Sequence, residues 1–325
     1  MTDLPVAGDV LFSVCAAEYL SYCTVKGLRA DTVTRYEGIL RGDLLPALGS
    51  LRLSEIGREE IVRLRDSLNA HLSPASINQT RIVLSGVLAH ARRSRGYDGP
   101  DFSTWFDRAR SAPQTTLDVL SPAEVELVAD VLARGAYRRV ESSALPAERS
   151  RMDSQYAALV RTAAYAGLRL SELRELRWKD IDWAGSKIVV RGRYTDLDGI
   201  NGTKSGKIRT VPMAGRVRDA LESLRGRDFC RGPSDLVFCN ACSGHLSGDT
   251  IYQVWVAASS AAGIRRTRFH DLRHAAGSLW IQRFDLRQVQ EWLGHASIQT
   301  TSRYLHARSR GDEAQAMDKL LEGAA

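Results

Sequence analysis

The sequence predicts a mainly α-helical protein with one small antiparallel β-sheet, an α+β fold divided into two domains. The chain has 325 residues, which is more than one average domain needs. Apolar residues recur at helical spacing between residues 10 and 96, and no convincing strand precedes residue 118. Two short β-branched runs follow at 186–192 and 207–213, and these would form the sheet.

Four helices are expected in the N-terminal domain, where short turns would fold them into a small bundle. Their ranges are 10–27, 29–45, 57–72 and 73–96. In the second helix Asp31 is a suitable N-cap. The apolar residues of that helix recur along one face, at Val33, Tyr36, Leu40 and Leu44.

The fourth helix has the clearest start and a basic end. Ser73 can cap it, and Pro74 then occupies the first helical position, where its missing N–H costs nothing. Three arginines, Arg92, Arg93 and Arg95, close the helix. Three cations so close together could neutralise the phosphates of a polyanion such as DNA, and we expect these three side chains to make such contacts.

The helical pattern is lost from Asp98 onward, in a stretch rich in Gly, Pro, Ser and Thr that is typical of a connection between domains. A helix restarts at Ser121, with Pro122 at the first position and Glu124 completing a capping box. We therefore assign an N-terminal domain, a linker and a second domain to residues 1–110, 111–120 and 121–325.

The second domain begins and ends with helices. A strongly apolar helix ends at Gly167, and the two predicted strands are joined by a Gly-, Asp- and Asn-rich segment, residues 193–206. The chain ends in a tail helix with an apolar face formed by Met317, Leu320 and Leu321. This face could pack on its own domain or on a neighbouring subunit, because amphipathicity does not identify the partner.

The charge of the protein is unevenly distributed. The net charge is +7, yet residues 1–118 contain 14 basic and 14 acidic side chains, so the whole excess lies in the remainder. A basic half attracts polyanions such as DNA, although an ordinary basic surface is equally compatible with this charge. No apolar run is long enough for a membrane span, and no secretory signal is recognisable. Five scattered cysteines fit a reducing compartment. We therefore expect a cytoplasmic protein.

One group of residues has side chains that suit zinc. Cys239 and Cys242 form a CxxC pair, with Cys230 and His245 close to it in the sequence. A zinc site of this kind needs a second pair of ligands, and no second CxxC or HxxxH follows. A loop with incidental thiols is the better interpretation, and we expect no metal or other cofactor.

An arginine and a glutamate mark the start of a helix after Gly167. Arg169 and Glu172 are three residues apart in AGLRLSEL, so they share one helical face. Glu172 can hold Arg169 in place, and the guanidinium can then offer two parallel donors to a phosphate. Taken alone, this spacing is more often an ordinary surface ion pair.

Two further motifs carry cations. Lys204 lies at a Ser- and Gly-rich turn between the strands; such a lysine is usually solvated, but it can also enter a DNA groove and donate a proton. In RFHDLRH, His270 and Arg273 share a helical face and suit a phosphate, with Asp271 in support. His274 is expected to point away from that face and to be structural.

The stretch LGHASIQTTSRYLH contains His295 and Tyr304. A polar run after the glycine indicates a break, after which Tyr304 would lie on a new element. Two arginines, two histidines and a lysine could hold a phosphodiester and neutralise the charge of its transition state. A tyrosine hydroxyl could attack that phosphate and form a covalent intermediate.

The order Arg, Lys, HxxR, GH and Tyr resembles the tyrosine site-specific recombinases, the phage integrase family. AGLRLSEL resembles the first arginine box of the family, TKSGKIRTVP its lysine hairpin, and HDLRH with LGHASIQTTSRYLH its second box. Residues 32–56 resemble the family's core-binding domain, so the likeness covers nearly the whole chain. It implies a helical core-binding domain followed by the recombinase catalytic domain, without the additional arm-binding domain of many phage integrases.

The resemblance also implies roles for the residues. A scissile phosphate would lie among Arg169, Lys204, His270, Arg273 and His295, and Tyr304 would attack it to give a 3′-phosphotyrosine and a free 5′-hydroxyl. The two arginines would bind the nonbridging oxygens, and Lys204 would protonate the 5′-oxygen. Lys207 competes for that role, but the distance of Lys204 from Val211 fits the family hairpin better. His270 would assist proton transfer at the tyrosine, and His295 would donate to the phosphate.

The implied function is recombination of double-stranded DNA by a tetramer, for integration or excision of a mobile element, with an accessory directionality factor as a further partner. A resolvase of the Xer kind shares this chemistry. A type IB topoisomerase shares it without bringing two duplexes together. A DNA-binding regulator without catalysis is disfavoured, because no catalytic position is substituted.

Overall fold

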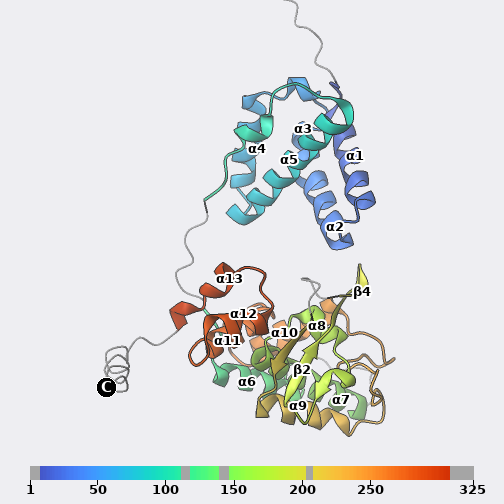
Figure 1. Cartoon of the computed structure of the whole chain (residues 1–325), viewed down its shortest axis with the longest axis vertical. Helices are drawn as coiled ribbons and strands as arrows, with labels where there is room; N and C mark the ends of the chain where they lie inside the picture. Colours follow the sequence, from blue (N-terminus) through green and yellow to red (C-terminus); the bar gives the residue numbers. More distant parts are fainter. Residues whose placement is uncertain (1–7, 111–117, 139–145, 203–207, 308–325) are drawn as a thin grey trace, which may run out of the picture. The chain divides into compact units, whose positions relative to one another are not determined.

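The computed structural model describes residues 8–110, 118–138, 146–202 and 208–307, and for residues 146–150 it describes the backbone only. The chain divides into two compact units, Met1–Pro113 and Gln114–Ala325, which Figure 1 shows in the colours of the sequence. Both units are mainly helical, and the paired strands lie in the second. The predicted α+β class is therefore confirmed.

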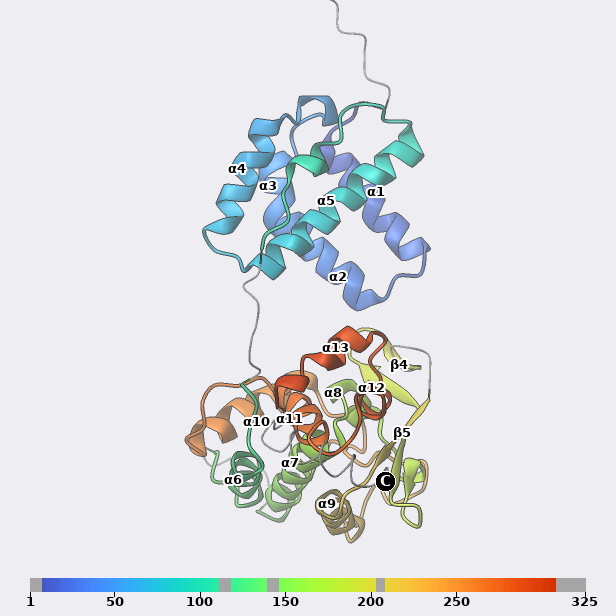
Figure 2. The ribbon, with the colours of Figure 1, turned by 60° about the vertical axis from the view of Figure 1, so that its left-hand side comes forward.

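The first unit is a helical bundle. Its α-helices are α1 (Phe12–Val25), α2 (Ala30–Ile39), α3 (Leu45–Leu48), α4 (Arg58–Asn69) and α5 (Pro74–Arg95). The longest of them, α5, contacts α1, α2 and α4 (Figure 2). The predicted cap of α5 is confirmed, since the Ser73 hydroxyl accepts a hydrogen bond from the backbone N–H of Ser76.

The second predicted helix of this unit differs from expectation in two ways. Asp31 is not the N-cap, because the helix begins at Ala30 and Arg29 is the capping residue. Asp31 lies in the first turn, where the helix dipole favours its negative charge. A π-helical turn, Leu40–Leu44, then separates α2 from α3. Pro46 lies in the first turn of α3 and has no N–H to donate to the preceding turn, which removes one regular helical hydrogen bond at this junction.

The stretch from Asp98 to residue 109 has the composition of a connection between domains, but it packs against the first unit. A 3₁₀ turn at Phe102–Trp105 buries Phe102, and Phe106 is buried behind it in the core of the first unit. The side chain of Asn78 exchanges two hydrogen bonds, of 2.9 and 3.0 Å, with the backbone of Ala109. Aromatic burial outweighs the loop composition here.

The second unit contains α6 (Pro122–Ala133), α7 (Pro146–Ala166), α8 (Leu170–Glu175), α9 (Gly215–Arg225), α10 (Gly248–Ala261), α11 (Asp271–Trp280), α12 (Leu286–Leu293) and α13 (Ile298–Ser302). The capping box at the start of α6 is confirmed: the Ser121 hydroxyl accepts from the Glu124 N–H, and the Glu124 carboxylate accepts from the Ser121 N–H. Among the described residues, no helix is both long and apolar enough to cross a membrane.

The predicted strands pair as expected. β2 (Lys187–Val190) lies antiparallel between β1 (Ile181–Asp182) and β5 (Arg209–Pro212), with Ile188 opposite Val211. The segment between β2 and β5 contains a second hairpin, β3 (Gly192–Thr195) and β4 (Gly199–Gly202). The sequence did not predict it, because these strands lack the alternation of apolar and polar residues that marks a half-buried strand.

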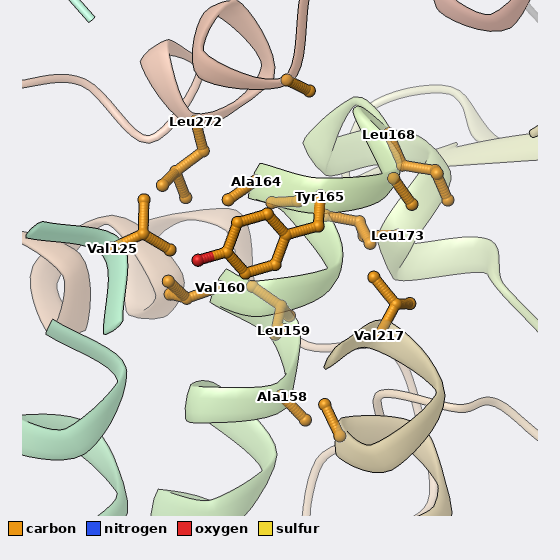
Figure 3. Close-up of a cluster of buried hydrophobic side chains, with 14 of the residues drawn as sticks. Val125, Ala158, Leu159, Val160, Ala164, Tyr165, Leu168, Leu173, Val217 and Leu272 are labelled. Atoms are coloured by element: carbon orange, nitrogen blue, oxygen red, sulfur yellow. The ribbon is translucent and has the colours of Figure 1, made fainter. Parts of the chain in front are cut away.

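The core of the second unit fixes the backbone from which the charged residues of the site project. In Figure 3, side chains from α6, α7, α9 and α11 meet around Tyr165, together with Leu168 and Leu173. Leu168, Leu173 and Leu272 are at most 1% exposed. Arg169, Glu172 and Arg273 are the immediate sequence neighbours of these leucines, so packing of the leucines holds the polar residues in register.

Candidate active site

The site is built around the Glu172 carboxylate at the start of α8. Its oxygens accept hydrogen bonds from the Arg169 backbone N–H at 2.8 Å and from Arg169 Nη1 at 2.9 Å. The Glu172 side chain is 1% exposed, whereas that of Arg169 keeps 23% of its surface open. The pair is therefore not an ordinary surface ion pair but a buried anion that orients a partly open cation.

A second arginine, which the sequence interpretation missed, binds the same carboxylate. Arg209 on β5 donates from Nη1 and Nη2 to the two Glu172 oxygens, at 2.8 and 2.7 Å. A detectable signal was present: Arg209 is two residues from the buried Val211, and alternate residues of a strand share a face. An arginine on the buried face of a strand needs a carboxylate or carbonyl partner.

Three arginines also converge on the last turn of α12. Arg209 Nε donates to the Trp292 carbonyl at 2.8 Å, Arg273 Nη2 donates to that of Leu293, and Arg169 Nη2 donates to that of Gly294 at 3.1 Å. Carbonyls at a helix C-terminus have no partner within the helix and carry its negative dipole end. The end of α12 therefore fixes the three guanidinium groups and offsets part of their mutual repulsion.

Two glycines make this close approach possible. Gly294 ends α12 with φ +62°, and a Cβ there would lie 3.1 Å from Cδ of Arg209. Gly167 has φ +61°, and its carbonyl accepts a hydrogen bond from Nη1 of the buried Arg273. A Cβ at Gly167 would lie 2.9 Å from the Trp280 ring. Both positions combine a left-handed backbone with contacts that leave no room for a side chain.

The electrostatics of the site follow from this packing. Burial by itself would raise the pKa of Glu172, but the hydrogen bonds from Arg209 and the charges of Arg209, Arg169 and Arg273 outweigh it and lower the pKa to about 2. Glu172 is therefore an anion at neutral pH. Burial, followed by the neighbouring Arg169 cation, lowers the pKa of Arg273. One carboxylate faces three cations, so the site retains an excess of positive charge that suits an anion.

Tyr304 follows α13 and is only 1% exposed. The prediction of a new element after the glycine is confirmed, since Gly294 ends α12 and Ser297 caps α13. The tyrosine ring lies against Gly277 of α11, where a Cβ would come within 2.7 Å of it. Figure 2 shows α11, α12 and α13 gathered on one side of the second unit.

His274 is hydrogen-bonded to the Tyr304 hydroxyl, with 2.7 Å between Nδ1 of the imidazole and the hydroxyl oxygen. The expectation that His274 points away from the face of His270 is wrong. Residues four apart on a helix share a face, so His274 lies beside His270, and their rings meet edge to face at 5.2 Å. Burial, followed by the nearby His270 and Arg303, lowers the pKa of His274 to about 4, so its imidazole is neutral at pH 7.

The other predicted site residues lie around this pair. His270 precedes the first turn of α11 and is largely exposed. Desolvation of the part of its ring that is covered, followed by the Arg273 charge, lowers its pKa. His295 Nδ1 lies 2.9 Å from the Thr301 hydroxyl, its ring lies parallel to that of Tyr304, and burial lowers its pKa to about 3. Asp271 supports the start of α11 rather than the cations, because its carboxylate accepts from the backbone N–H and guanidinium of Arg268.

Some predicted residues lie elsewhere. Lys204, its competitor Lys207 and the tail helix with Met317, Leu320 and Leu321 are outside the described residues. In the first unit, Arg92 donates to the Gly99 carbonyl at 3.0 Å, Arg93 lies over the Tyr22 ring, and Arg95 pairs with Glu18. Their expected contact with DNA stays a prediction.

The cysteine and histidine group has other contacts. His245 Nε2 lies 2.8 Å from a Glu175 carboxylate oxygen, and its ring stacks on Tyr194 at 3.6 Å. Cys230 and Cys239 are buried, whereas Cys242 is exposed. In the part of the chain that the structure describes, no three His, Cys, Asp or Glu side chains are grouped so that they could hold a metal ion.

Chemically, the site combines convergent guanidinium groups, neutral imidazoles and a tyrosine hydroxyl, an arrangement that can bind a phosphate beside a nucleophile. The model of the phage integrase family matches residues 141–310, just over half of the sequence. The chain therefore belongs to the phage integrase family.

Relatives over longer spans agree with this assignment. A tyrosine recombinase XerD of Mycobacterium tuberculosis is 30% identical over 304 residues, covering 88% of this chain and 90% of that protein. A tyrosine recombinase XerC of Corynebacterium efficiens is 34% identical over 146 residues, covering 44% of each chain. The chain spans about half the length of the first curated relatives that it matches.

Solved structures share the fold. The Tn1549 transposon integrase in complex with a circular intermediate DNA has a TM-score of 0.71 and 17% identity, with 98% of this chain and 100% of that chain covered. A lambda integrase tetramer bound to a Holliday junction has a TM-score of 0.67 and 18% identity, with 89% and 79% covered. At these identities the likeness establishes the fold.

The Glu172 network predicts a pH-dependent stability. Because the pKa of this carboxyl is about 2 in the folded state and higher in the unfolded chain, its stabilisation is present above pH 4.5 or so and is lost as the pH falls toward 2. Glu172→Gln should reduce the free energy of unfolding at neutral pH by about 3 kcal/mol. Urea unfolding of both proteins at several pH values measures this difference.

The difference between the two proteins should shrink as the medium is acidified toward pH 3.5 or so, because the unfolded carboxyl then binds a proton. Glu222→Gln is the matched control: Glu222 pairs with Arg218 at 3.5 Å with about half of its side chain exposed, and its loss should change little. An equal loss for Glu172→Gln at every pH would contradict the charged network.

Proposed function

We propose that the protein is a site-specific DNA recombinase that cleaves and rejoins strands through a 3′-phosphotyrosine at Tyr304. The observation that carries this proposal is the placement of one buried hydroxyl, bonded to a neutral imidazole, in the field of Arg273 and Arg169. Burial raises the pKa of Tyr304 while these cations act to lower it. Their effect favours the anionic form that must develop during attack.

The proposed reaction needs no energy source. Tyr304 attacks the scissile phosphorus, the bond to the 5′-oxygen breaks, and the ester stores the bond energy for rejoining. Arg169 and Arg273 stabilise the added charge on the nonbridging oxygens, and His295 donates from the ring nitrogen that does not face Thr301. Lys204, in the proposed role of general acid, protonates the leaving 5′-oxygen.

DNA binding has to uncover the nucleophile. With the tyrosine 1% exposed, its hydroxyl can meet a phosphodiester only if the segment from Ile298 to Tyr304 shifts. His270 and Arg169 are open to solvent on the same site, so they mark the side from which a phosphate would enter. In this proposal the tyrosine becomes accessible to a phosphate only after DNA is bound.

The DNA substrate and the assembly are inferred from charge and from relatives. The positive excess of the chain lies after residue 118, and solved neighbours were crystallised with a circular intermediate DNA and as a tetramer on a Holliday junction. We assign residues 1–110 to core DNA binding, residues 121–325 to catalysis, and a tetramer to the active assembly. Arg92 and Arg95 would exchange their exposed ion pairs for phosphates, an exchange that costs little.

Integration or excision of a mobile element in the cytoplasm, with an accessory directionality factor, is the proposed biological setting. Free thiols at all five cysteines are compatible with a reducing compartment. The second candidate is resolution of DNA multimers, which the XerD match over most of the chain favours. Both use the same chemistry, so the sequence of the recombined DNA separates them: the ends of an inserted element indicate integration, and a single chromosomal site indicates resolution.

Replacing the nucleophile tests the reaction. Tyr304→Phe should leave DNA affinity within about twofold, because the ring contacts persist, but should abolish covalent DNA adducts. The probe is genomic DNA of the host from which the gene comes: complexes formed with the full-length protein are denatured, and the DNA that stays attached is sequenced. Adducts that persist in the Phe variant would show that another residue attacks.

A second prediction concerns the position of the nucleophile. Gly277→Ala places a Cβ 2.7 Å from the Tyr304 ring, which pushes the ring away from α11 and from the contact between its hydroxyl and His274. Cleavage should therefore fall about 100-fold, with DNA affinity retained. The measurement is the rate of adduct formation on a nicked duplex, whose sequence is the site found most often in the DNA that stays attached to the protein. Gly215→Ala is the control, because a Cβ there meets no atom within 4 Å. Equal rates for both variants would contradict the proposed contact.

A further inference from the structure

His274 lies in the HDLRH motif that carries the family resemblance, but the resemblance gave it no role. Its side chain nevertheless contacts the hydroxyl of the proposed nucleophile. Its Nδ1 lies 2.7 Å from the Tyr304 hydroxyl oxygen. The ring is partly buried on α11, and the centroids of the two rings are 5.8 Å apart. His270, to which the resemblance gives proton transfer, has its described ring contact with His274.

We infer that His274, rather than His270, is the base that accepts the proton of the Tyr304 hydroxyl when the tyrosine attacks DNA, and that returns it when the strand is rejoined. This inference rests on the proposed function, because it names the proton acceptor of that same reaction.

The direction of the hydrogen bond supports the assignment. Burial raises the pKa of Tyr304, so its hydroxyl is protonated in the free protein and can donate. A neutral imidazole has one acceptor nitrogen and one donor nitrogen. If Nδ1 accepts from the tyrosine, Nε2 carries the ring proton, and this tautomer is ready to take a second proton at Nδ1.

The O–H bond of Tyr304 breaks, its proton forms an N–H bond at Nδ1 of His274, and the oxygen forms the new bond to phosphorus. The bond from phosphorus to the 5′-oxygen breaks, and that oxygen takes its proton from the general acid. On rejoining, the 5′-hydroxyl attacks phosphorus and gives its proton back to the general acid. The bond from phosphorus to the tyrosine oxygen breaks, and His274 returns its proton to that oxygen.

Binding of DNA would raise the proton affinity of His274. His274 faces Asp271 on its own helix and His270 and Arg268 just before that helix begins. From the segment packed against it, it faces His295, Arg303 and Tyr304. In the free protein, burial and the cationic groups keep the imidazole neutral. A phosphate bound at the adjacent arginines adds negative charge, which raises the proton affinity of the imidazole toward the range of an effective base. The edge-to-face contact with His270 also keeps His274 at the side from which the phosphate enters. The tyrosine can therefore shift toward DNA while its hydroxyl stays within reach of His274.

Substitutions at His274 separate a base from a positioning residue. Asparagine places an amide group close to the position of Nδ1 and keeps a hydrogen-bonding partner without basicity, whereas alanine removes both. If His274 is the base, His274→Asn and His274→Ala should both slow adduct formation on the nicked duplex by about 100-fold or more. His71→Gln, at an exposed histidine of the first unit, is the control and should cleave as the unmodified protein does.

A sulfur-substituted substrate distinguishes the base from the acid. In a duplex with a 5′-bridging phosphorothiolate the leaving sulfur needs no proton, so defects of the general acid disappear and defects of the base remain. The His274 variants should be equally slow on both duplexes, and the fall in rate of the unmodified protein at acid pH should be absent from His274→Asn.

The possible results are decisive. Near-normal cleavage by His274→Asn, with loss only in His274→Ala, would make His274 a positioning residue and overturn the inference. Faster cleavage by His274→Ala would show that His274 restrains the tyrosine in its buried position, and this result would overturn the inference as well. A defect confined to His270→Asn would return the role to His270. If the unmodified protein forms no adduct with any DNA, the proposed function itself fails.

Discussion

The catalytic unit depends on one buried carboxylate and one helix end. Glu172 accepts hydrogen bonds from Arg169 and Arg209, and the last carbonyls of α12 accept from these two and from Arg273. Guanidinium groups repel one another and lose hydration when buried. They can converge only because an anion and a negative dipole end lie among them. The same contacts tie α8, β5, α11 and α12 together, so the anion-binding site and the fold of this region form one network.

The site also explains why its histidines are neutral. Burial and the arginine cations lower the pKa values of His270, His274 and His295. Neutral imidazoles can accept as well as donate protons, whereas imidazolium groups could only donate. The arginines therefore carry the charge and the histidines are left for proton transfer and hydrogen bonding. Tyr304 lies where these two sets meet, against Gly277 and His274.

The sequence predicted most of the fold because its signals are local. Capping residues such as Ser73 and Ser121, left-handed glycines such as Gly167 and the β-branched runs act over a few residues. The sequence interpretation placed Arg169 beside Glu172 by helical spacing, but it missed the burial of Glu172, because burial depends on α12 and β5, far away in the chain. Arg209 was missed for the same reason, although its register with Val211 indicated an inward side chain. The error at His274 was of another kind: the spacing of four from His270 places it on the same face, and that spacing was visible in the sequence.

The central claim is that Tyr304 forms a covalent bond to DNA inside this cation network. The most direct measurement is mass spectrometry of the full-length protein trapped on the nicked duplex, digested with protease and nuclease. The account predicts a nucleotide remnant joined through its 3′-phosphate to the peptide that contains Tyr304. A remnant on a different residue, or a linkage through a 5′-phosphate, would contradict it.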